Sequence, residues 1–361
     1  MLYTAEKKIT DTSDPYAKFR YVPTFGEGYG EKKTPAFFLL RWNGQSGGES
    51  TLQRISFKDQ YQALLGQPIF SPKDPEVVYA TGYEYVKDGR LLGLKACTNR
   101  PSSIWEVRVP LNAPADGEVL ESDGQRKRLT GTELACRSPR IVEIEGKHTL
   151  VWLANPIGGP HASSTMIQSM VLPDSDSEQP TSVQTLVDVV QEPDEVGGFP
   201  GLYPGVALAN EPFTLLSGVP HVALHSIWES RQVILLVSLI DGKKRNLTPL
   251  NDDLYSWSLL QTDGEKKIIC VRSTPSSPPE LMLGEIEQES VRWTLLAKPS
   301  LSPAGTHYRI PHCKLLSYVV QWMMLWLTLQ QKWFQYRVVG QRKPLSCSLL
   351  AQLTLVLHLA F

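Results

Sequence analysis

Gly44-Gln45-Ser46-Gly47-Gly48 satisfies the G-x-S-x-G pattern, which in a nucleophile elbow places a reactive serine on a sharp turn. An elbow needs a strand before the serine and a helix after it, so that the hydroxyl stands above the sheet beside an oxyanion-hole N–H. Phe37 to Trp42 fits the strand, but Glu49 to Ile55 alternates polar and β-branched residues, as a returning strand does. The pattern therefore predicts a hairpin loop around Ser46 and no nucleophile.

The histidines give no metal or acid–base motif. His221 and His225 have a spacing that ligates metals on a helix, but their segment is typical of a strand and indicates ordinary blade residues. Paired carboxylates such as Asp252-Asp253 lie in polar turns. None of the seven histidines belongs to an H-E-x-x-H motif. They are His148, His161, His221, His225, His307, His312 and His358. We therefore predict no catalytic, cofactor-binding or metal-ligating residue, and no cofactor.

Charge and cysteine usage exclude further classes. The 36 basic and 37 acidic residues nearly cancel over 361 residues, which argues against a nucleic-acid partner. The five cysteines are scattered without a C-x-x-C pair, which argues against a disulfide framework and a zinc site: Cys97, Cys136, Cys270, Cys313 and Cys347. The start of the chain carries Glu6, Lys7 and Lys8 where a signal peptide needs an apolar core. We expect a cytoplasmic protein.

Short apolar runs bounded by Gly, Pro, Asp and Ser recur over the first 300 residues and predict strands. Asp241-Gly242, Thr262-Asp263-Gly264 and Glu145-Gly146 each separate two such runs, and glycine in these turns supplies the positive φ of a tight hairpin. The resulting antiparallel meanders cannot bury both faces alone, so they are expected to stack around an axis as propeller blades.

Several short motifs add a resemblance to a known family. They include Cys97-Thr98-Asn99-Arg100 followed by Ser103 to Val107, and Ser273-Thr274-Pro275-Ser276-Ser277-Pro278-Pro279-Glu280-Leu281. The others are Tyr3 to Lys8, Phe25-Gly26-Glu27, Val187-Asp188-Val189-Val190 and Ser230-Arg231-Gln232. Together and in this order, they make the chain resemble the propeller region of acylaminoacyl-peptidases, in the prolyl oligopeptidase superfamily of serine peptidases.

The resemblance implies a propeller that limits, by size, the access of short N-acylated peptides to an α/β-hydrolase domain with a Ser-Asp-His triad. The resemblance covers residues 1–300 and begins part-way into the family's propeller, after its earliest blades. Because those blades are missing, we expect an all-β, unclosed propeller of about five blades. The hydrolase domain is expected near residue 300, where an atypical apolar tail of residues 301–361, helical or disordered, begins instead.

Gly158-Gly159-Pro160-His161 is similar to the His-Gly-Gly-Pro run at the oxyanion site of this superfamily. Ile157 stands where the leading histidine belongs, and no elbow follows at the expected distance. A Gly-Gly-Pro turn after a strand that ends at Ala154 is the preferred interpretation.

The tail differs in composition from everything before it. From Ser290 to Phe361 there is no Asp, Glu or Asn, and two apolar stretches, Leu315–Leu329 and Leu345–Phe361, flank a basic segment. Each stretch is shorter than the roughly 20 residues of a spanning helix and contains polar residues. An altered reading frame or retained non-coding sequence explains this composition better than a membrane hairpin.

These observations favour a truncated acylaminoacyl-peptidase-like protein whose catalytic domain is absent and which is inactive alone. The alternative is a non-enzymatic propeller scaffold, with membrane attachment through the tail as a third hypothesis. The sequence leaves homo-oligomerisation open.

Overall fold

The computed structural model describes about two thirds of the chain, and its described residues form twenty strands and no α-helix. The described residues are 1–6, 15–16, 19, 35–42, 50–57, 63–86, 92–93, 97–111, 119–122, 126–173, 182–195, 198–249, 255–275 and 277–299. The strands fall into five four-stranded units, numbered here in chain order.

Unit 1 has the strand order β1-β2-β3-β7, and its last strand comes from later in the chain. Strand β7 runs parallel to β3, with Arg54 opposite Val119, whereas the other pairs are antiparallel. The strands are β1 (Leu2–Glu6), β2 (Pro35–Trp42), β3 (Ser50–Phe57) and β7 (Val119–Ser122).

Units 2 and 3 are antiparallel meanders joined into one sheet by a single pairing of Ser102 with Ala135. Unit 2 contains β4 (Ala63–Phe70), β5 (Val77–Glu84), β6 (Ser102–Arg108) and β8 (Arg126–Arg128). Unit 3 contains β9 (Leu134–Ile144), β10 (Lys147–Pro156), β11 (Met166–Val171) and β12 (Gln184–Val187).

Units 4 and 5 are separate four-stranded sheets with strands in sequence order. Unit 4 contains β13 (Phe213–Leu216), β14 (Val219–Trp228), β15 (Arg231–Ser238) and β16 (Lys244–Asn246). Unit 5 contains β17 (Ser256–Thr262), β18 (Lys267–Thr274), β19 (Ser277–Ile286) and β20 (Val291–Ala297).

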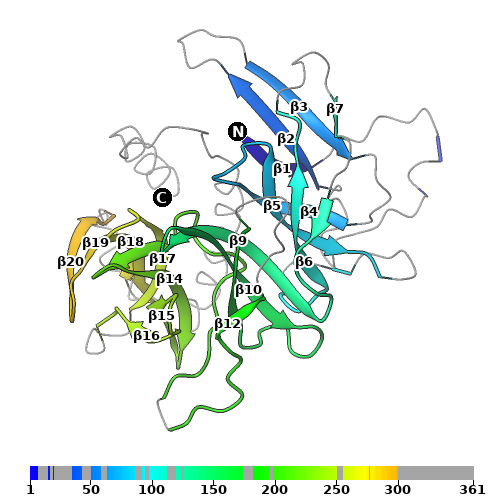
Figure 1. The fold of residues 1–361 in the computed structure, drawn as a ribbon. Coiled ribbons are helices and arrows are strands. Elements are labelled where there is room, and N and C mark those ends of the chain that lie inside the picture. Colours follow the sequence, from blue (N-terminus) through cyan, green and yellow to red (C-terminus); the bar gives the residue numbers. More distant parts are fainter. Residues whose placement is uncertain are drawn as a thin grey trace.

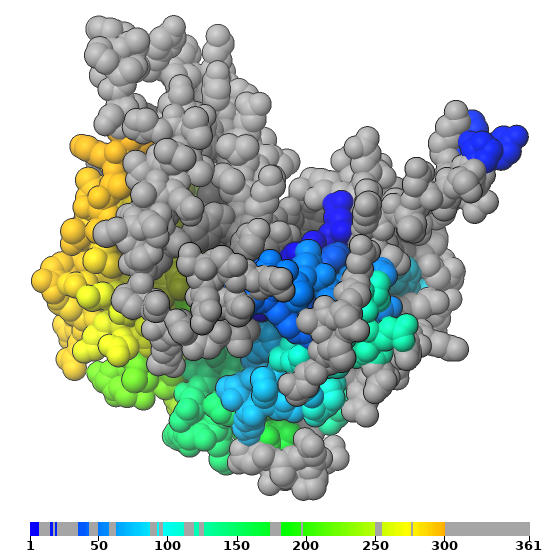
Figure 2. Space-filling view, turned by 90° about the horizontal axis from the view of Figure 1, so that it is seen from above, coloured from blue at the N-terminus to red at the C-terminus, as the bar shows by residue number. Residues whose placement is uncertain are grey.

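The five units follow one another around an arc, with unit 1 and unit 5 at its two ends (Figure 1). Seen from above, the coloured surface runs in the same order from the blue of unit 1 through green to the orange of unit 5 (Figure 2). The predicted all-β, unclosed propeller of about five blades is confirmed for the described residues.

An apolar layer lies between each pair of successive units, which explains why the meanders stack. Phe37 of unit 1 packs with Val78 of unit 2, and Tyr79 of unit 2 shares a cluster with Trp152 of unit 3. Leu153 of unit 3 packs with Leu224 of unit 4. The opposite face of unit 4 packs against unit 5, in a cluster that contains Trp257. Burying a side chain of this size stabilises the fold by roughly 1.5–3 kcal/mol.

The hairpin turns predicted from glycine adopt the expected backbone. Glu145 and Gly146 have φ values of 50° and 77°, so that β9 and β10 are joined by a two-residue turn with both central residues at positive φ. Gly242 and Gly264 have φ values of 68° and 86°. Local turn chemistry therefore sets the strand boundaries here.

The predictions for the tail, including the boundary at residue 300 and both apolar stretches, lie outside the described residues. Over the described ranges, no helix is long and apolar enough to cross a membrane.

Candidate functional site

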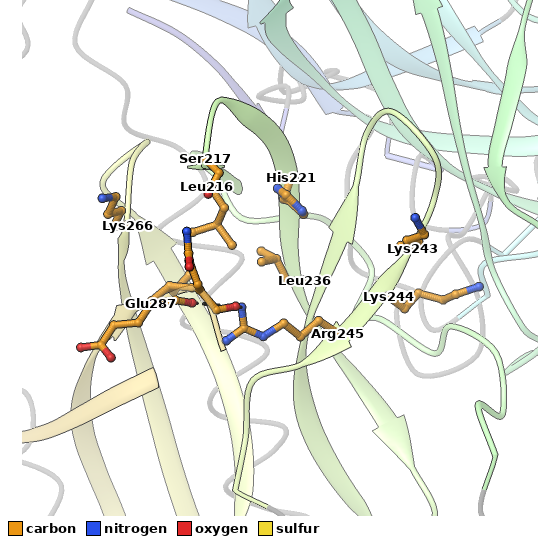
Figure 3. Close-up of a pocket in the computed structure, with 11 residues that line it drawn as sticks. Leu216, Ser217, His221, Leu236, Lys243, Lys244, Arg245, Lys266 and Glu287 are labelled. Carbon is orange, nitrogen blue, oxygen red and sulfur yellow. Dashed lines mark hydrogen bonds between the residues drawn. The ribbon is translucent and has the colours of Figure 1, made fainter. Parts of the chain in front are cut away.

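A pocket of about 510 Å³ opens where units 4 and 5 meet (Figure 3). Its apolar lining comes from Leu216, Leu236 and Ile286, of which the last two are almost completely buried. The polar lining comes from the ends of β13, β14, β16 and β18 and from the turn after β19: Ser217, His221, Lys243, Lys244, Arg245, Lys266, Glu287 and Gln288.

Arg245 joins the two sides of this pocket. Its guanidinium donates to the carbonyl oxygens of Glu287 at 3.0 Å, Gln288 at 2.6 Å and Ser290 at 3.1 Å, so β16 of unit 4 holds the β19–β20 turn of unit 5. Figure 3 shows the side chain reaching across to that turn. All three acceptors are main-chain carbonyl oxygens, and none of them is a carboxylate that would neutralise the guanidinium charge.

The two lysines before Arg245 interact outside the pocket. Lys243 Nζ lies 2.8 Å from Asp241 Oδ2, and this contact raises the pKa of Lys243 and lowers that of Asp241. Lys244 Nζ lies 4.8 Å from the ring centre of Phe199. Four lining residues are basic and one, Glu287, is acidic, but the Lys243 ammonium is paired with Asp241 and the Lys244 ammonium lies over Phe199.

Asn99 holds the Gly-Gly-Pro turn that the sequence had marked. Its Nδ2 donates to the carbonyl oxygens of Gly158 at 3.0 Å, Gly159 at 2.8 Å and Pro160 at 3.3 Å, and the Gly158 N–H donates back to the Asn99 carbonyl. Because the three carbonyls turn toward Asn99, this run presents acceptors where an oxyanion hole needs N–H donors. The predicted turn is confirmed, but β10 before it ends at Pro156 and not at Ala154 as predicted.

The same contact brings Cys97 against His161. Cys97 Sγ lies 3.0 Å from His161 Nδ1, and Thr98 Oγ1 donates to the His161 carbonyl at 3.2 Å. Cys97 is partly exposed and His161 is exposed. This is a contact between a nucleophilic thiol and a base that the sequence analysis did not anticipate, because the residues are 64 positions apart.

The elements around Ser46 do not fit a nucleophile elbow, although Ser46 itself lies outside the described residues. Strand β2 before it pairs antiparallel with β3 after it, with Trp42 opposite Ser50. A strand therefore stands where the elbow requires a helix. The predicted hairpin is confirmed.

The two histidines of β14 lie in different surroundings. His221 Nδ1 is 2.8 Å from the Val219 carbonyl oxygen, whereas His225 is buried and burial lowers its pKa to about 4. His225 is therefore neutral at physiological pH. The carboxylates Asp252 and Asp253 lie outside the described residues. No group of three or more potential metal ligands is found in the part of the chain that the structure describes.

Two buried arginines of β9 join unit 3 to the segment that enters unit 4. Arg137 donates to Asn155 Oδ1 and, at 3.0 Å, to the Val206 carbonyl. Arg140 donates to the carbonyls of Leu208 and Ala209 at 2.7 and 2.6 Å. Burial lowers the pKa of Arg137 to about 10, which keeps it charged at neutral pH.

Residues 6–303 match the family described as the N-terminal domain of acylamino-acid-releasing enzyme. The chain belongs to this family. It is 29% identical over 289 residues to acylamino-acid-releasing enzyme 2 of Oryza sativa subsp. japonica, covering 74% of this chain and 36% of that protein. It is 30% identical over 266 residues to the Arabidopsis thaliana acylamino-acid-releasing enzyme, covering 72% and 33%.

The chain spans about a third of the length of these curated relatives. Among solved structures, a puromycin hydrolase is similar with a TM-score of 0.42 and 12% identity, covering 75% of this chain and 45% of that structure.

Within this N-terminal domain of the acylamino-acid-releasing enzyme family, the sequence motifs and the structural contacts coincide at one place. Cys97-Thr98-Asn99 was part of the resemblance, and the Gly158 run was a separate candidate; the structure brings them together. The basic pocket was missed, although Lys243-Lys244-Arg245 beside a predicted strand was a visible signal.

Proposed function

We propose that this propeller controls which peptides reach a serine-peptidase unit and that it carries no peptidase chemistry of its own. The main support is the match of residues 6–303 to the N-terminal domain of acylamino-acid-releasing enzyme. The curated relatives carry that enzyme's name, so the proposed substrates are short N-acylated peptides.

Three of the groups considered as peptidase residues support a non-catalytic role for the domain. The Gly158 run faces Asn99 with its carbonyls, strand β3 follows the Ser46 loop, and His225 is buried in the core of unit 4. Each of these groups is accounted for by folding. None is placed as a nucleophile, a base or an oxyanion donor would be.

A domain that selects peptides by size needs rigid walls. The apolar layers between units and the buried bonds of Arg137 and Arg140 to the segment entering unit 4 connect successive sheets. A peptide that exceeds the space between such walls is excluded without any specific contact. This is the physical basis of the proposed selection.

The experiment joins residues 1–299 of this chain to the part of the Arabidopsis enzyme that lies beyond its matching region. The chimera is compared with that part alone on an N-acetylated dipeptide and on a long N-acetylated polypeptide. We expect the chimera to cleave only the dipeptide, and the part alone to cleave both. Equal cleavage of both substrates by a folded chimera would contradict the proposal.

A further inference from the structure

The contact of Cys97 with His161 goes beyond the proposed role in peptide selection. The Sγ to Nδ1 distance of 3.0 Å is within hydrogen-bond range for a sulfur atom, and the two residues come from different units. Cys97 lies just before β6 of unit 2, and His161 lies beyond β10 of unit 3.

The backbone around this pair is held in place on both sides. Thr98 donates to the His161 carbonyl, and the almost fully buried Asn99 donates to the three carbonyls that precede it. These bonds fix the backbone on which His161 stands, and the imidazole itself contacts the thiol at 3.0 Å. A base held within hydrogen-bond distance of a nucleophile is the arrangement that activates it.

The other described cysteines are in surroundings that suppress reaction. Cys136 is buried, and burial raises its pKa to about 11; Cys270 is buried, and burial raises its pKa further. The thiolate is the reactive form of cysteine, so both thiols are largely unreactive at neutral pH. Only Cys97, among the three described cysteines, combines access to solvent with a neighbouring base.

We propose that Cys97 is a modification site for small electrophiles and small disulfides, with His161 Nδ1 as the base. With a disulfide, the Cys97 sulfur attacks one sulfur of the reagent while the thiol proton passes to His161. A mixed disulfide forms, the reagent's S–S bond breaks, and the leaving thiolate takes the proton from the imidazolium. No external oxidant is needed, because the disulfide itself is reduced.

The test measures iodoacetamide alkylation of the full chain, with the extent at each cysteine read by peptide mass spectrometry. In this step the sulfur–carbon bond forms, the thiol proton passes to His161, the carbon–iodine bond breaks and iodide leaves. At pH 7 we expect Cys97 to react at least about tenfold faster than Cys136 and Cys270, whose thiolate fractions are suppressed by burial. A comparable rate at either buried cysteine would overturn the selectivity.

The role of His161 is tested with His161→Gln and with a matched control, His148→Gln, on β10 of the same unit. At pH 7 the first change is expected to slow alkylation of Cys97 several-fold, and the second to leave it unchanged.

Added imidazole distinguishes the base from a structural role. It should restore part of the Cys97 rate in a His161→Ala variant, because a free base can then occupy the vacated position. If His161→Gln and His161→Ala both react at the wild-type rate at pH 7, Cys97 is merely an exposed thiol and the proposal is wrong.

Discussion

Two arginines that each bind three main-chain carbonyls allow the connections between units to be tested. Arg140 donates to Pro139, Leu208 and Ala209 and is 4% exposed, whereas Arg245 donates to Glu287, Gln288 and Ser290 near the surface. Both guanidinium groups donate to three main-chain carbonyls. They differ in burial.

Arg140→Met leaves the carbonyls of Leu208 and Ala209 without their donor in a site that water does not reach freely. Hydrogen bonds to a charged group contribute about 1.5–3 kcal/mol each, and part of the loss is offset because the buried guanidinium is no longer desolvated. We therefore expect Arg140→Met to lower the free energy of unfolding by about 2–4 kcal/mol. Arg245→Met exposes its carbonyls to water, so about 0.5 kcal/mol is expected.

The assay is urea unfolding of each full-length variant, followed by tryptophan fluorescence. With a slope of about 3 kcal/mol per molar urea, Arg140→Met should shift the midpoint by about 1 M and Arg245→Met by about 0.2 M. An equal or larger shift for Arg245→Met would refute the reasoning, because burial would then not decide the contribution of these contacts.

Two further predictions concern His225 and Gly242. Because burial lowers the folded pKa of His225 to about 4, the unfolded chain binds more protons between about pH 6.5 and 4, so stability present above pH 6.5 is lost on acidification. Between pH 7 and pH 5 the free energy of unfolding should fall by up to about 2 kcal/mol for this reason. His225→Gln should flatten the dependence of the urea midpoint on pH in this range. An unchanged slope in this variant would contradict the role of His225. Gly242→Ala should destabilise the chain by about 3 kcal/mol, since Gly242 has positive φ and an added Cβ would collide with the Leu186 carbonyl oxygen. Gly158→Ala, also at positive φ but facing open space, should cost about 1 kcal/mol, and equal thermal shifts for the two variants would contradict the collision.

Features set by neighbouring residues could be predicted from the sequence. Glu145-Gly146 and Asp241-Gly242 were predicted as hairpin turns because glycine accepts positive φ, and alternation after Glu49 predicted β3. Ser217 also adopts positive φ, at 51° before Gly218, but its type gave little indication of it.

Features that depend on distant residues could not be predicted. Strand β7 leaves the order of the chain to pair with β3 across more than sixty residues. Arg137 and Arg140 belong to a residue type that is usually exposed, and only the folded segment near Val206 shows why both are buried. The Cys97–His161 contact required units 2 and 3 to be placed together.

We propose above that this propeller has no peptidase chemistry of its own. The most direct measurement is the release of p-nitroaniline from an N-acetylalanine p-nitroanilide by the purified full chain, with the Arabidopsis relative as a positive control. We expect a rate equal to that of the protein-free blank. Release by the full chain that disappears in Ser46→Ala would contradict it.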